Sequence, residues 1–374
     1  MSADDDTPEL TKAKLLKESK KKEVIEILIE GLWPTGTPKP EGPMIVINDN
    51  VVSAITERNK RYTAPKDKLS TNNPANFLKD FIRHTTCNEN WPQRLWDERI
   101  TARQRYGDKQ VLEFVSWRDG DDRPFPDRFD PKPGEEIPVL AFEALSIPRE
   151  ARALGREDEP WLIQVIVSQR LINTHFSVVA SRAGLHVDTL AHLQMSVKTQ
   201  PEIDATFVAG VKGKDDEGKD IEYRAYVTGE AKQIGERILE DQIREQVAKA
   251  FEITRELQGA EAIHAVIPVA FKVIRYPIEP GAVDSRRGIY LAQFKPIMRS
   301  EFDKKYGDKS KLHEMPLVLQ SKAFYEPFPP IRGISYKNPV KPKLPKAGKP
   351  KTVKPKKSKK EPEAVPNGAE SAEG

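Results

Sequence analysis

The sequence predicts a mixed α/β protein, with a β-sheet core flanked by helices, a helical N-terminal region and a disordered C-terminal tail. Between residues 160 and 298, segments with alternating apolar side chains are interleaved with segments of helical period, which is typical of a sheet covered by helices. Patterns in the first 140 residues are mainly helical, and the end of the chain has too few apolar residues to fold. We therefore expect an accessory region over 1–140, a core over 141–336 and a tail over 337–374.

In the accessory region, apolar residues at helical spacing among lysines and glutamates predict a helix over 14–33. The stretch MIVINDNVVSAITERN, residues 44–59, predicts a strand followed by a helix, and Pro74 marks the first turn of another helix. Alternation predicts a strand over 111–117. Residues 119–138 combine prolines with acidic residues, so we expect an irregular surface loop there.

In the core, Pro160 opens a helical stripe of apolar residues that includes one polar residue, Gln169. Three strands follow, and the second and third are joined by a polar turn typical of a hairpin. A long helix then runs to a terminating glycine, and two further strands complete the core. The expected strands are 190–197, 203–211, 221–229, 262–274 and 288–298, and the expected long helix is 230–259.

The net charge of +4 is unevenly distributed along the chain. Residues 337–360 contain eleven lysines and no acid, and residues 361–374 contain four glutamates, so the rest of the chain has a net charge of −3. The tail alternates lysine with proline, a composition that favours an extended, disordered chain. Such an arm attracts phosphates without reading sequence, and the alternative is a solubilising tail without a defined partner.

Several classes of protein are disfavoured. The single cysteine, Cys87, can form no internal disulfide, and no apolar run approaches the roughly 20 residues that cross a bilayer. The N-terminus has no apolar stretch typical of a secretory signal. The six histidines show no paired metal-ligand spacing, and no nucleotide-binding glycine loop is found. We expect a cytoplasmic protein that uses neither a membrane nor a nucleotide cofactor.

Two stretches carry the most specific chemistry: QPEIDATFVAG, residues 200–210, and IEYRAYVTGEAKQ, residues 221–233. Asp204 opens one predicted strand, and Glu230 and Lys232 stand at the end of the next. A hairpin brings the first residues of one strand opposite the last residues of the other. Residues 230 and 232 project to the same face of an extended chain, so the sequence predicts Asp204, Glu230 and Lys232 side by side.

This combination suits hydrolysis of a phosphodiester. Mg²⁺ favours oxygen ligands and binds through one or two carboxylates, here Asp204 and Glu230, and the carbonyl of Ala231 can add a third ligand. The ammonium of Lys232 can orient the attacking water or stabilise developing charge. The alternative is a surface hairpin in which Glu230 and Lys232 are solvated neighbours.

The arrangement resembles the PD-(D/E)xK nuclease superfamily, which includes many type II restriction endonucleases. The matching residues are Pro201 and Asp204 for the first half and Glu230, Ala231 and Lys232 for the second, within roughly residues 160–300. The first half departs from the literal Pro-Asp pair, because two residues separate Pro201 from Asp204. The resemblance implies a restriction-endonuclease-like fold, Mg²⁺ held by Asp204 and Glu230, and a Lys232 that assists the nucleophile.

In this superfamily the preceding helix often supplies a fourth active-site group. Gln169 is the first candidate and Glu159 the second, and either can equally be a structural residue. Gln242, in the following helix, is a candidate for supporting the site.

For contacts to DNA, the stretch QRLWDERITARQRYG gathers arginines and glutamines that can bond phosphates or base edges. A second basic group lies in SRRG, which we expect to be a turn. A solvated helix face is the alternative for the first group. The candidate DNA-binding residues are Arg94, Arg99, Arg103, Gln104, Arg105, Arg286 and Arg287.

These observations together predict a Mg²⁺-dependent DNA endonuclease of the restriction type. It would act on double-stranded DNA as a homodimer, because two cuts on paired strands favour two sites related by a twofold axis. Two alternatives stay open: a non-catalytic nucleic-acid-binding protein with the same fold, and a structure-selective repair or recombination nuclease.

Overall fold

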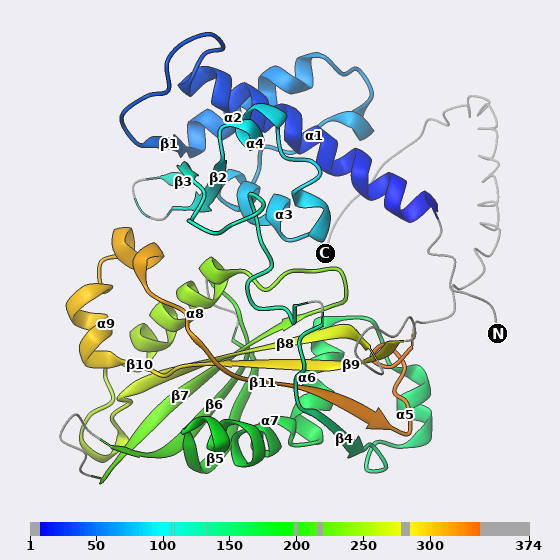
Figure 1. The fold of residues 1–374 in the computed structure, drawn as a ribbon, viewed down its shortest axis with the longest axis vertical. Coiled ribbons are helices and arrows are strands. Elements are labelled where there is room, and N and C mark those ends of the chain that lie inside the picture. Colours follow the sequence, from blue (N-terminus) through cyan, green and yellow to red (C-terminus); the bar gives the residue numbers. More distant parts are fainter. Residues whose placement is uncertain are drawn as a thin grey trace, which may run out of the picture. The chain divides into compact units, whose positions relative to one another are not determined.

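The computed structural model describes residues 8–105, 107, 109–132, 134–197, 201–214, 220–277 and 285–336, and within these ranges the side chains from residue 20 onward except those of 195–197 and 214. The predicted tail, 337–374, lies outside the described residues, as does most of the turn predicted between the two hairpin strands. The fold is mixed α/β, as the sequence predicted (Figure 1). The described residues belong to one compact unit.

The main sheet is mixed. Its strands lie in the order β4-β11-β9-β8-β7-β6-β5, and β10 pairs with β8. The pairs β7–β8 and β4–β11 are parallel, and the other pairs are antiparallel. The strands are β4 (Val139–Glu143), β5 (His186–Val197), β6 (Ile203–Lys214), β7 (Asp220–Lys232), β8 (Ala265–Pro277), β9 (Ser285–Phe294), β10 (Ile297–Met298) and β11 (Leu319–Phe328).

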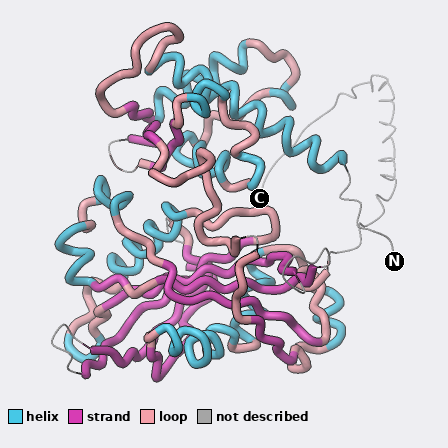
Figure 2. Tube along the Cα trace, viewed as in Figure 1, coloured by secondary structure: helices cyan, strands magenta, loops and turns pink. Residues whose placement is uncertain are grey.

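Helices cover both faces of this sheet, and Figure 2 shows the strands as a layer between them. On β7, Ala225, Val227 and Ala231 pack in the cluster that includes α6 (Glu159–Ser168), whereas Tyr226 packs in the cluster that includes α8 (Glu240–Ile253). Because both faces are covered, the last eight residues of β7 are all buried and do not alternate. Even-numbered residues at the end of β7 therefore face α8.

The helix predicted from Pro160 onward is interrupted. Asp158 caps α6 by accepting a 3.0 Å hydrogen bond from the backbone N–H of Trp161. The helix ends at Gln169, and Arg170 takes a left-handed conformation with a φ of 52°. A short helix, α7 (Leu171–Thr174), and a π-helical turn, His175–Ala180, follow. The predicted apolar residues are therefore present on a helical face, but Arg170 divides them between two helices.

The prediction of one helix over 230–259 was wrong at both ends. Residues 230–232 continue β7 and pair with β8 in register, Glu230 with Ala270 and Lys232 with Lys272. Gly235, with a φ of 81°, interrupts the chain before α8 begins. Sheet pairing thus overrides the helix-forming composition of the GEAK stretch.

The accessory region contains a three-stranded sheet in the order β1-β3-β2. The helix predicted over 14–33, the strand and helix of 44–59 and the strand of 111–117 are confirmed. The arginine-rich stretch is divided between two elements: Arg94 lies in the short helix α4, and Arg103 and Gln104 lie in strand β2. No helix or strand lies in the described residues between β3 and β4, as predicted for the loop. The elements are α1 (Pro8–Leu32), β1 (Met44–Ile47), α2 (Asn48–Lys60), α3 (Phe77–Ile82), α4 (Gln93–Asp97), β2 (Ile100–Gln104) and β3 (Gln110–Ser116).

Further elements are two helices, α5 (Arg149–Leu154) and α9 (Arg299–Lys305), and several 3₁₀ turns. The turns are Pro65–Asp67, Pro74–Asn76, Thr85–Cys87, Ser181–Ala183, Gly259–Glu261 and Lys309–Glu314. Within the part of the chain that the structure describes, no helix combines the length and apolar character needed to cross a membrane.

The loop between β3 and β4 fastens the accessory region to the core. Arg237 is buried and precedes α8 in the sequence. Its guanidinium group donates to the carbonyl oxygens of Ile82, Phe125 and Pro126. It also pairs with Asp127 at 2.5 Å. Each buried guanidinium N–H group that meets an acceptor avoids a desolvation cost. The accessory region is thus held against the end of the sheet where β7 stops.

Candidate active site

The β6–β7 hairpin brings Asp204 beside the triplet 230–232. Ala205 pairs with Gly229 in the antiparallel register. The backbone N–H of Ala231 donates a 2.8 Å hydrogen bond to Oδ2 of Asp204. The hairpin therefore produces the juxtaposition that the sequence predicted, although the triplet belongs to a strand.

Glu230 and Lys232 form a buried ion pair. Both face α8, and neither is more than 3% exposed. The ammonium of Lys232 bonds directly to Oε1 of Glu230. It also donates to the carbonyl oxygen of Ala231 at 3.0 Å and to Oε1 of Glu159 at 3.3 Å. One cation thus links two carboxylates and a carbonyl group, which excludes the alternative of a solvated surface pair.

Gln246 of α8 holds the second oxygen of Glu230, and sequence reasoning missed it. Its side-chain amide donates to Oε2 of Glu230, and to the carbonyl oxygen of Glu202 at 3.1 Å. The residue that the sequence predicts to support the site, Gln242, lines the cleft described below. The residue one turn further along the same helix face, Gln246, is the one that reaches the carboxylate.

Glu159, the second candidate for a fourth active-site group, lies in the site. Besides its contact with Lys232, its Oε1 accepts a 3.1 Å hydrogen bond from Arg83, whose guanidinium also donates to Oε1 of Glu236 at 2.8 Å. Arg83 follows α3 in the accessory region, and nothing in its sequence context marks it. The accessory region thus contributes a cation to the site.

Gln169, the first candidate, is not brought to the site. It lies at the far end of α6, where its side-chain amide exchanges hydrogen bonds of 3.0 and 2.8 Å with the hydroxyl of Ser146. Glu159 and Gln169 stand at opposite ends of the same helix, so only one of them can lie near the end of β7.

Burial and like charge raise the pKa values of both hairpin carboxyl groups. Desolvation, reinforced by the charge of Glu230, raises the pKa of Asp204 from 3.8 to about 8. Desolvation also raises the pKa of Glu230, against the attraction of Lys232. Burial acts to lower the pKa of Lys232, but the charges of Glu230, Glu159 and Asp204 outweigh it and raise this pKa, so the ammonium stays charged at neutral pH. The positive charge of Lys232 is therefore not enough to keep the pKa values of Asp204 and Glu230 at their ordinary level.

The oxygen atoms at the site are of the type that Mg²⁺ prefers as ligands. Among the described residues, no group of three or more His, Cys, Asp or Glu side chains has the geometry to hold a metal ion. Asp204, Glu230 and the carbonyl of Ala231 nevertheless offer only oxygen atoms, and Mg²⁺ commonly binds through one or two carboxylates while keeping several waters. Additional positive charge would favour the ionised form of both carboxyl groups. Because Lys232 bonds to Glu230 and Ala231, binding an ion through those two residues requires the ammonium to shift.

A cleft of about 680 Å³ leads to this group. Asp204, Lys232 and Glu159 lie in its lining, together with side chains from the Pro74–Asn76 turn and α3 on one side and from α8 and the Lys309–Glu314 turn on the other. The charged residues of the lining are Lys79, Asp80, Arg83, Glu159, Glu202, Asp204, Lys232, Glu245, Lys249, Glu252 and Lys309.

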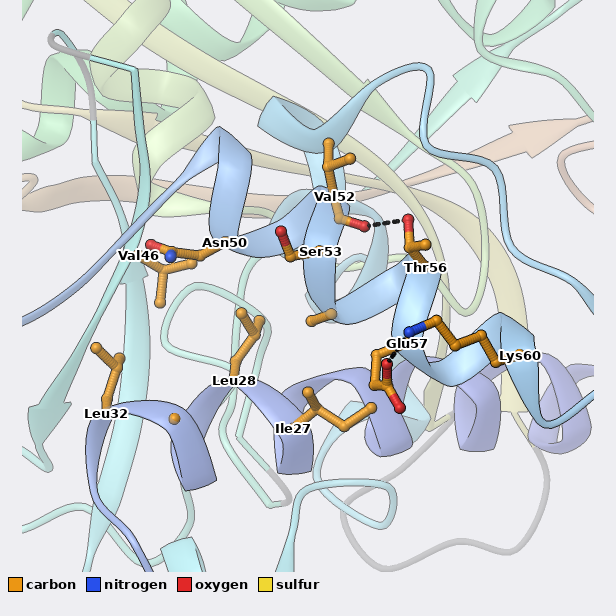
Figure 3. Close-up of a pocket in the computed structure, with 12 residues that line it drawn as sticks. Ile27, Leu28, Leu32, Val46, Asn50, Val52, Ser53, Thr56, Glu57 and Lys60 are labelled. Atoms are coloured by element: carbon orange, nitrogen blue, oxygen red, sulfur yellow. Dashed lines mark hydrogen bonds and ion pairs between the residues drawn. The ribbon is translucent and has the colours of Figure 1, made fainter.

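A second hollow, of about 540 Å³, lies between α1 and α2 (Figure 3). Ile27, Leu28 and Leu32 line it from α1, and its charged side chains, Glu57 and Lys60, pair with each other at 2.6 Å. Because these two charges are already neutralised and exposed, this hollow offers no perturbed group for chemistry. The cleft at the end of β7 is therefore the candidate active site.

The arginines predicted to bind DNA have partners within the chain. Arg94 lies over the ring of Trp33 at 4.2 Å and pairs with Glu30 at 3.2 Å. Arg99 lies over the ring of Trp117 at 4.8 Å. These contacts hold both guanidinium groups against the accessory region.

Arg103 and Arg105 share the carboxylate of Glu113, at 2.8 and 3.6 Å. Gln104 is buried, and its backbone N–H donates to Oδ2 of Asp241 at 3.2 Å. Alternation in β2 turns Gln104 inward and its neighbours outward. None of these residues lines the cleft.

Arg286 and Arg287 lie in β9, so the expected turn at SRRG is wrong. Arg286 pairs with Glu326 of the adjacent strand at 2.7 Å. Arg287 is buried and pairs with Glu157 at 3.4 Å. Cross-strand and buried pairs of this kind stabilise the sheet and leave little charge for a partner.

Comparisons with known proteins do not assign this chain to a family. No family model matches the sequence, and no curated protein or solved structure is significantly similar to it.

Proposed function

We propose that this protein is a Mg²⁺-dependent nuclease that hydrolyses phosphodiester bonds, with its active site at the end of the β6–β7 hairpin. The observation that carries the proposal is the group of Asp204, Glu230, Glu159 and Lys232 at the cleft, in which Glu230 and Lys232 are buried and Asp204 and Glu159 are half-buried. Three carboxyl groups there lie near one lysine, and the pKa of Asp204 is raised to about 8. Strongly perturbed groups in a cleft favour a functional site over a structural ion pair.

The roles follow from position. Asp204 and Glu230, with the carbonyl of Ala231, would hold the ion. Such an ion polarises a phosphoryl oxygen and lowers the pKa of a bound water. Lys232, whose raised pKa keeps it cationic, would orient the attacking water or stabilise negative charge on the phosphoryl group. Glu159 and Gln246 would position Lys232 and Glu230 through the bonds described above.

The order of elements supports a restriction-endonuclease-like fold for the core. Helix α6 is followed by the antiparallel strands β5, β6 and β7, then by α8 and the parallel strand β8. Asp204 opens β6, and Glu230 and Lys232 end β7, which is the placement that the resemblance to the PD-(D/E)xK superfamily implies. Double-stranded DNA as the substrate and a homodimer as the active form belong to the same proposal.

The experiment is a digest of phage DNA by the full chain with Mg²⁺, beside reactions with EDTA and with Asp204→Ala. We expect cleavage only by the wild type with Mg²⁺. Discrete bands would indicate sequence recognition, and a smear would indicate a nonspecific or structure-selective nuclease. DNA that is retarded but intact under all conditions would overturn the proposal in favour of a binding protein with the same fold. Cleavage by Asp204→Ala at the wild-type rate would remove this site from the reaction.

A further inference from the structure

The walls of the cleft indicate which form of nucleic acid reaches the site. One wall carries Lys79 and Arg83, from α3 and the residue after it, and the other carries Lys249 of α8 and Lys309. Lys79 forms an ion pair with Glu245, which links α3 directly to α8. The cleft is thus bounded by cations on two sides and crossed by an ion pair.

The size of the cleft sets a limit on the substrate. A volume of about 680 Å³ lies within the range of roughly 300–1,000 Å³ that holds drug-sized ligands. Such a space accepts on the order of one or two nucleotides. A duplex, with a major groove alone about 12 Å wide, is much larger than this space, and the Lys79–Glu245 ion pair links two of the helices that line it.

We propose that the cleft takes a single nucleic acid strand, whose phosphates contact Lys79 and Arg83 on one side and Lys249 and Lys309 on the other. The inference rests on the nuclease function proposed above and narrows its substrate: within double-stranded DNA, the site would act on a locally unpaired strand or a frayed end, and not on a fully paired segment.

The charge balance of the lining fits this substrate only once a divalent cation is bound. Among the described residues, five basic side chains line the cleft beside six acidic ones, and a bound Mg²⁺ would tip the balance toward positive charge. Lys79, Arg83 and Lys249 now pair with Glu245, Glu236 and Glu252. Binding of a strand therefore requires these cations to exchange the carboxylates for phosphate oxygens.

Phosphate contacts should dominate the affinity. Among the described residues that line the cleft, none is aromatic, so these residues supply no base stacking, the usual sequence-tolerant contact to single strands. The amides of Asn73, Asn76 and Gln242 can bond base edges of an unpaired strand. Four phosphate contacts predict that log K falls with log[salt] with a slope of about −3, from roughly −0.7 per contact.

The test is fluorescence anisotropy with a labelled oligonucleotide, single-stranded or annealed to its complement, in Ca²⁺ with no Mg²⁺. We expect the single strand to bind at least about tenfold tighter than the duplex, with the salt slope given above. Lys79→Ala and Arg83→Ala should each weaken single-strand binding and make the slope shallower by about 0.7. Because Lys79→Ala also breaks an ion pair, Lys309→Ala, at an exposed lysine, provides the same test without that loss.

Matched controls come from the accessory region. Lys60→Ala and Arg94→Ala each remove a cation that is paired with a carboxylate outside the cleft lining, and both should bind as the wild type does. Equal affinity for duplex and single strand, or equal losses in the cleft and control variants, would overturn the inference.

Cleavage of the same two substrates in Mg²⁺ separates the two proposals. Tight binding and cutting of the duplex, with the single strand ignored, would overturn the inference and keep the nuclease. Tight single-strand binding without cleavage of either substrate would overturn the nuclease and keep the strand-binding cleft.

Discussion

The hairpin group, which consists of Asp204, Glu230, Glu159 and Lys232, and the arginine-rich stretch 94–105 both contain many charged side chains. The two regions differ in how far these charges are buried and in how they are paired. In the hairpin group, three carboxyl groups lie near one lysine, and Glu230 is fully buried. In the arginine-rich stretch, Arg94 and Arg103 remain partly exposed; Arg94 pairs with Glu30, and Arg103 shares Glu113 with Arg105.

This difference separates function from stability. Burying like charges together costs free energy, which is why the pKa of Asp204 rises to about 8. Partly exposed pairs such as Arg94 with Glu30 cost little and contribute about 0–1 kcal/mol. In the sequence, the number of arginines suggested a functional surface. In the structure, the feature that indicates chemistry is instead a set of carboxyl groups that are removed from water without an equal number of cations beside them.

The largest effect should come from removing the lysine of the hairpin group. Lys232→Met leaves Glu230 buried without its cation, a loss that typically destabilises a protein by about 3–5 kcal/mol. At a temperature where the variant is folded by circular dichroism, cleavage should fall by at least about two orders of magnitude. Initial rates on a labelled DNA substrate measure this loss.

The double variant Glu230→Gln/Lys232→Met separates the two effects. It removes both charges, so stability should return to within about 1 kcal/mol of the wild type by the same burial argument, while cleavage stays lost. A stable Lys232→Met variant that cuts at the wild-type rate would contradict the catalytic role of the lysine.

Two glutamines of α8 provide the next comparison. Gln246→Ala removes the donor to Glu230 and to the carbonyl of Glu202, and buried acceptors left without a donor cost about 1–3 kcal/mol. Gln242→Ala, one turn earlier and partly exposed, should change the free energy of unfolding by no more than about 0.5 kcal/mol. Urea denaturation of both variants measures the difference, and equal losses would mean that Gln246 does not support the carboxylate.

The raised pKa of Asp204 predicts a pH dependence of stability in the absence of divalent ions. Because this pKa is about 8 in the folded protein and ordinarily 3.8, the folded state binds the proton more tightly between these values. The stabilisation from Asp204 is therefore complete below about pH 4 and is lost as the pH rises through about 8. Urea denaturation in EDTA at several pH values, with wild type and Asp204→Asn compared at each, isolates this contribution. A difference that does not change with pH would show that Asp204 titrates normally.

The smallest effects should come from the arginine-rich stretch. Arg94→Ala breaks a partly exposed ion pair, so it should lower the free energy of unfolding by no more than about 1 kcal/mol. Both Arg94→Ala and Arg103→Ala should leave the cleavage rate unchanged. A tenfold or greater loss of cleavage in a folded variant would restore this stretch as a DNA-contacting surface.

The hairpin was predictable because its signals are local. Period-two apolar runs on both sides of a polar turn specify β6 and β7, and residue parity then places Glu230 and Lys232 on one face. The long helix was misplaced because its composition favours helix, whereas pairing of residues 230–232 with β8 decides the outcome. Strand β4 escaped notice because it is short, and only its parallel contact with β11 makes it a strand.

The rest of the site could not be read from the sequence because it depends on tertiary contacts. Arg83 reaches Glu159 and Glu236 only because the loop between β3 and β4 fastens the accessory region to the core. Gln246 became recognisable only once the true start of α8 was known. The pairing of Arg103 and Arg105 with Glu113 likewise requires the register of β2 on β3.

Binding of Mg²⁺ to the free protein tests the central claim, that the hairpin group is a cation site, without any assumption about substrate. Thermal unfolding near pH 8 is compared in EDTA and in saturating Mg²⁺ for the wild type, Asp204→Asn and Arg103→Ala. A ligand that binds only the folded state stabilises it by mass action, so Mg²⁺ should raise the Tm of the wild type and of Arg103→Ala by at least about 2 °C. It should leave the Tm of Asp204→Asn unchanged. The same shift in all three proteins, or in none of them, would contradict the account.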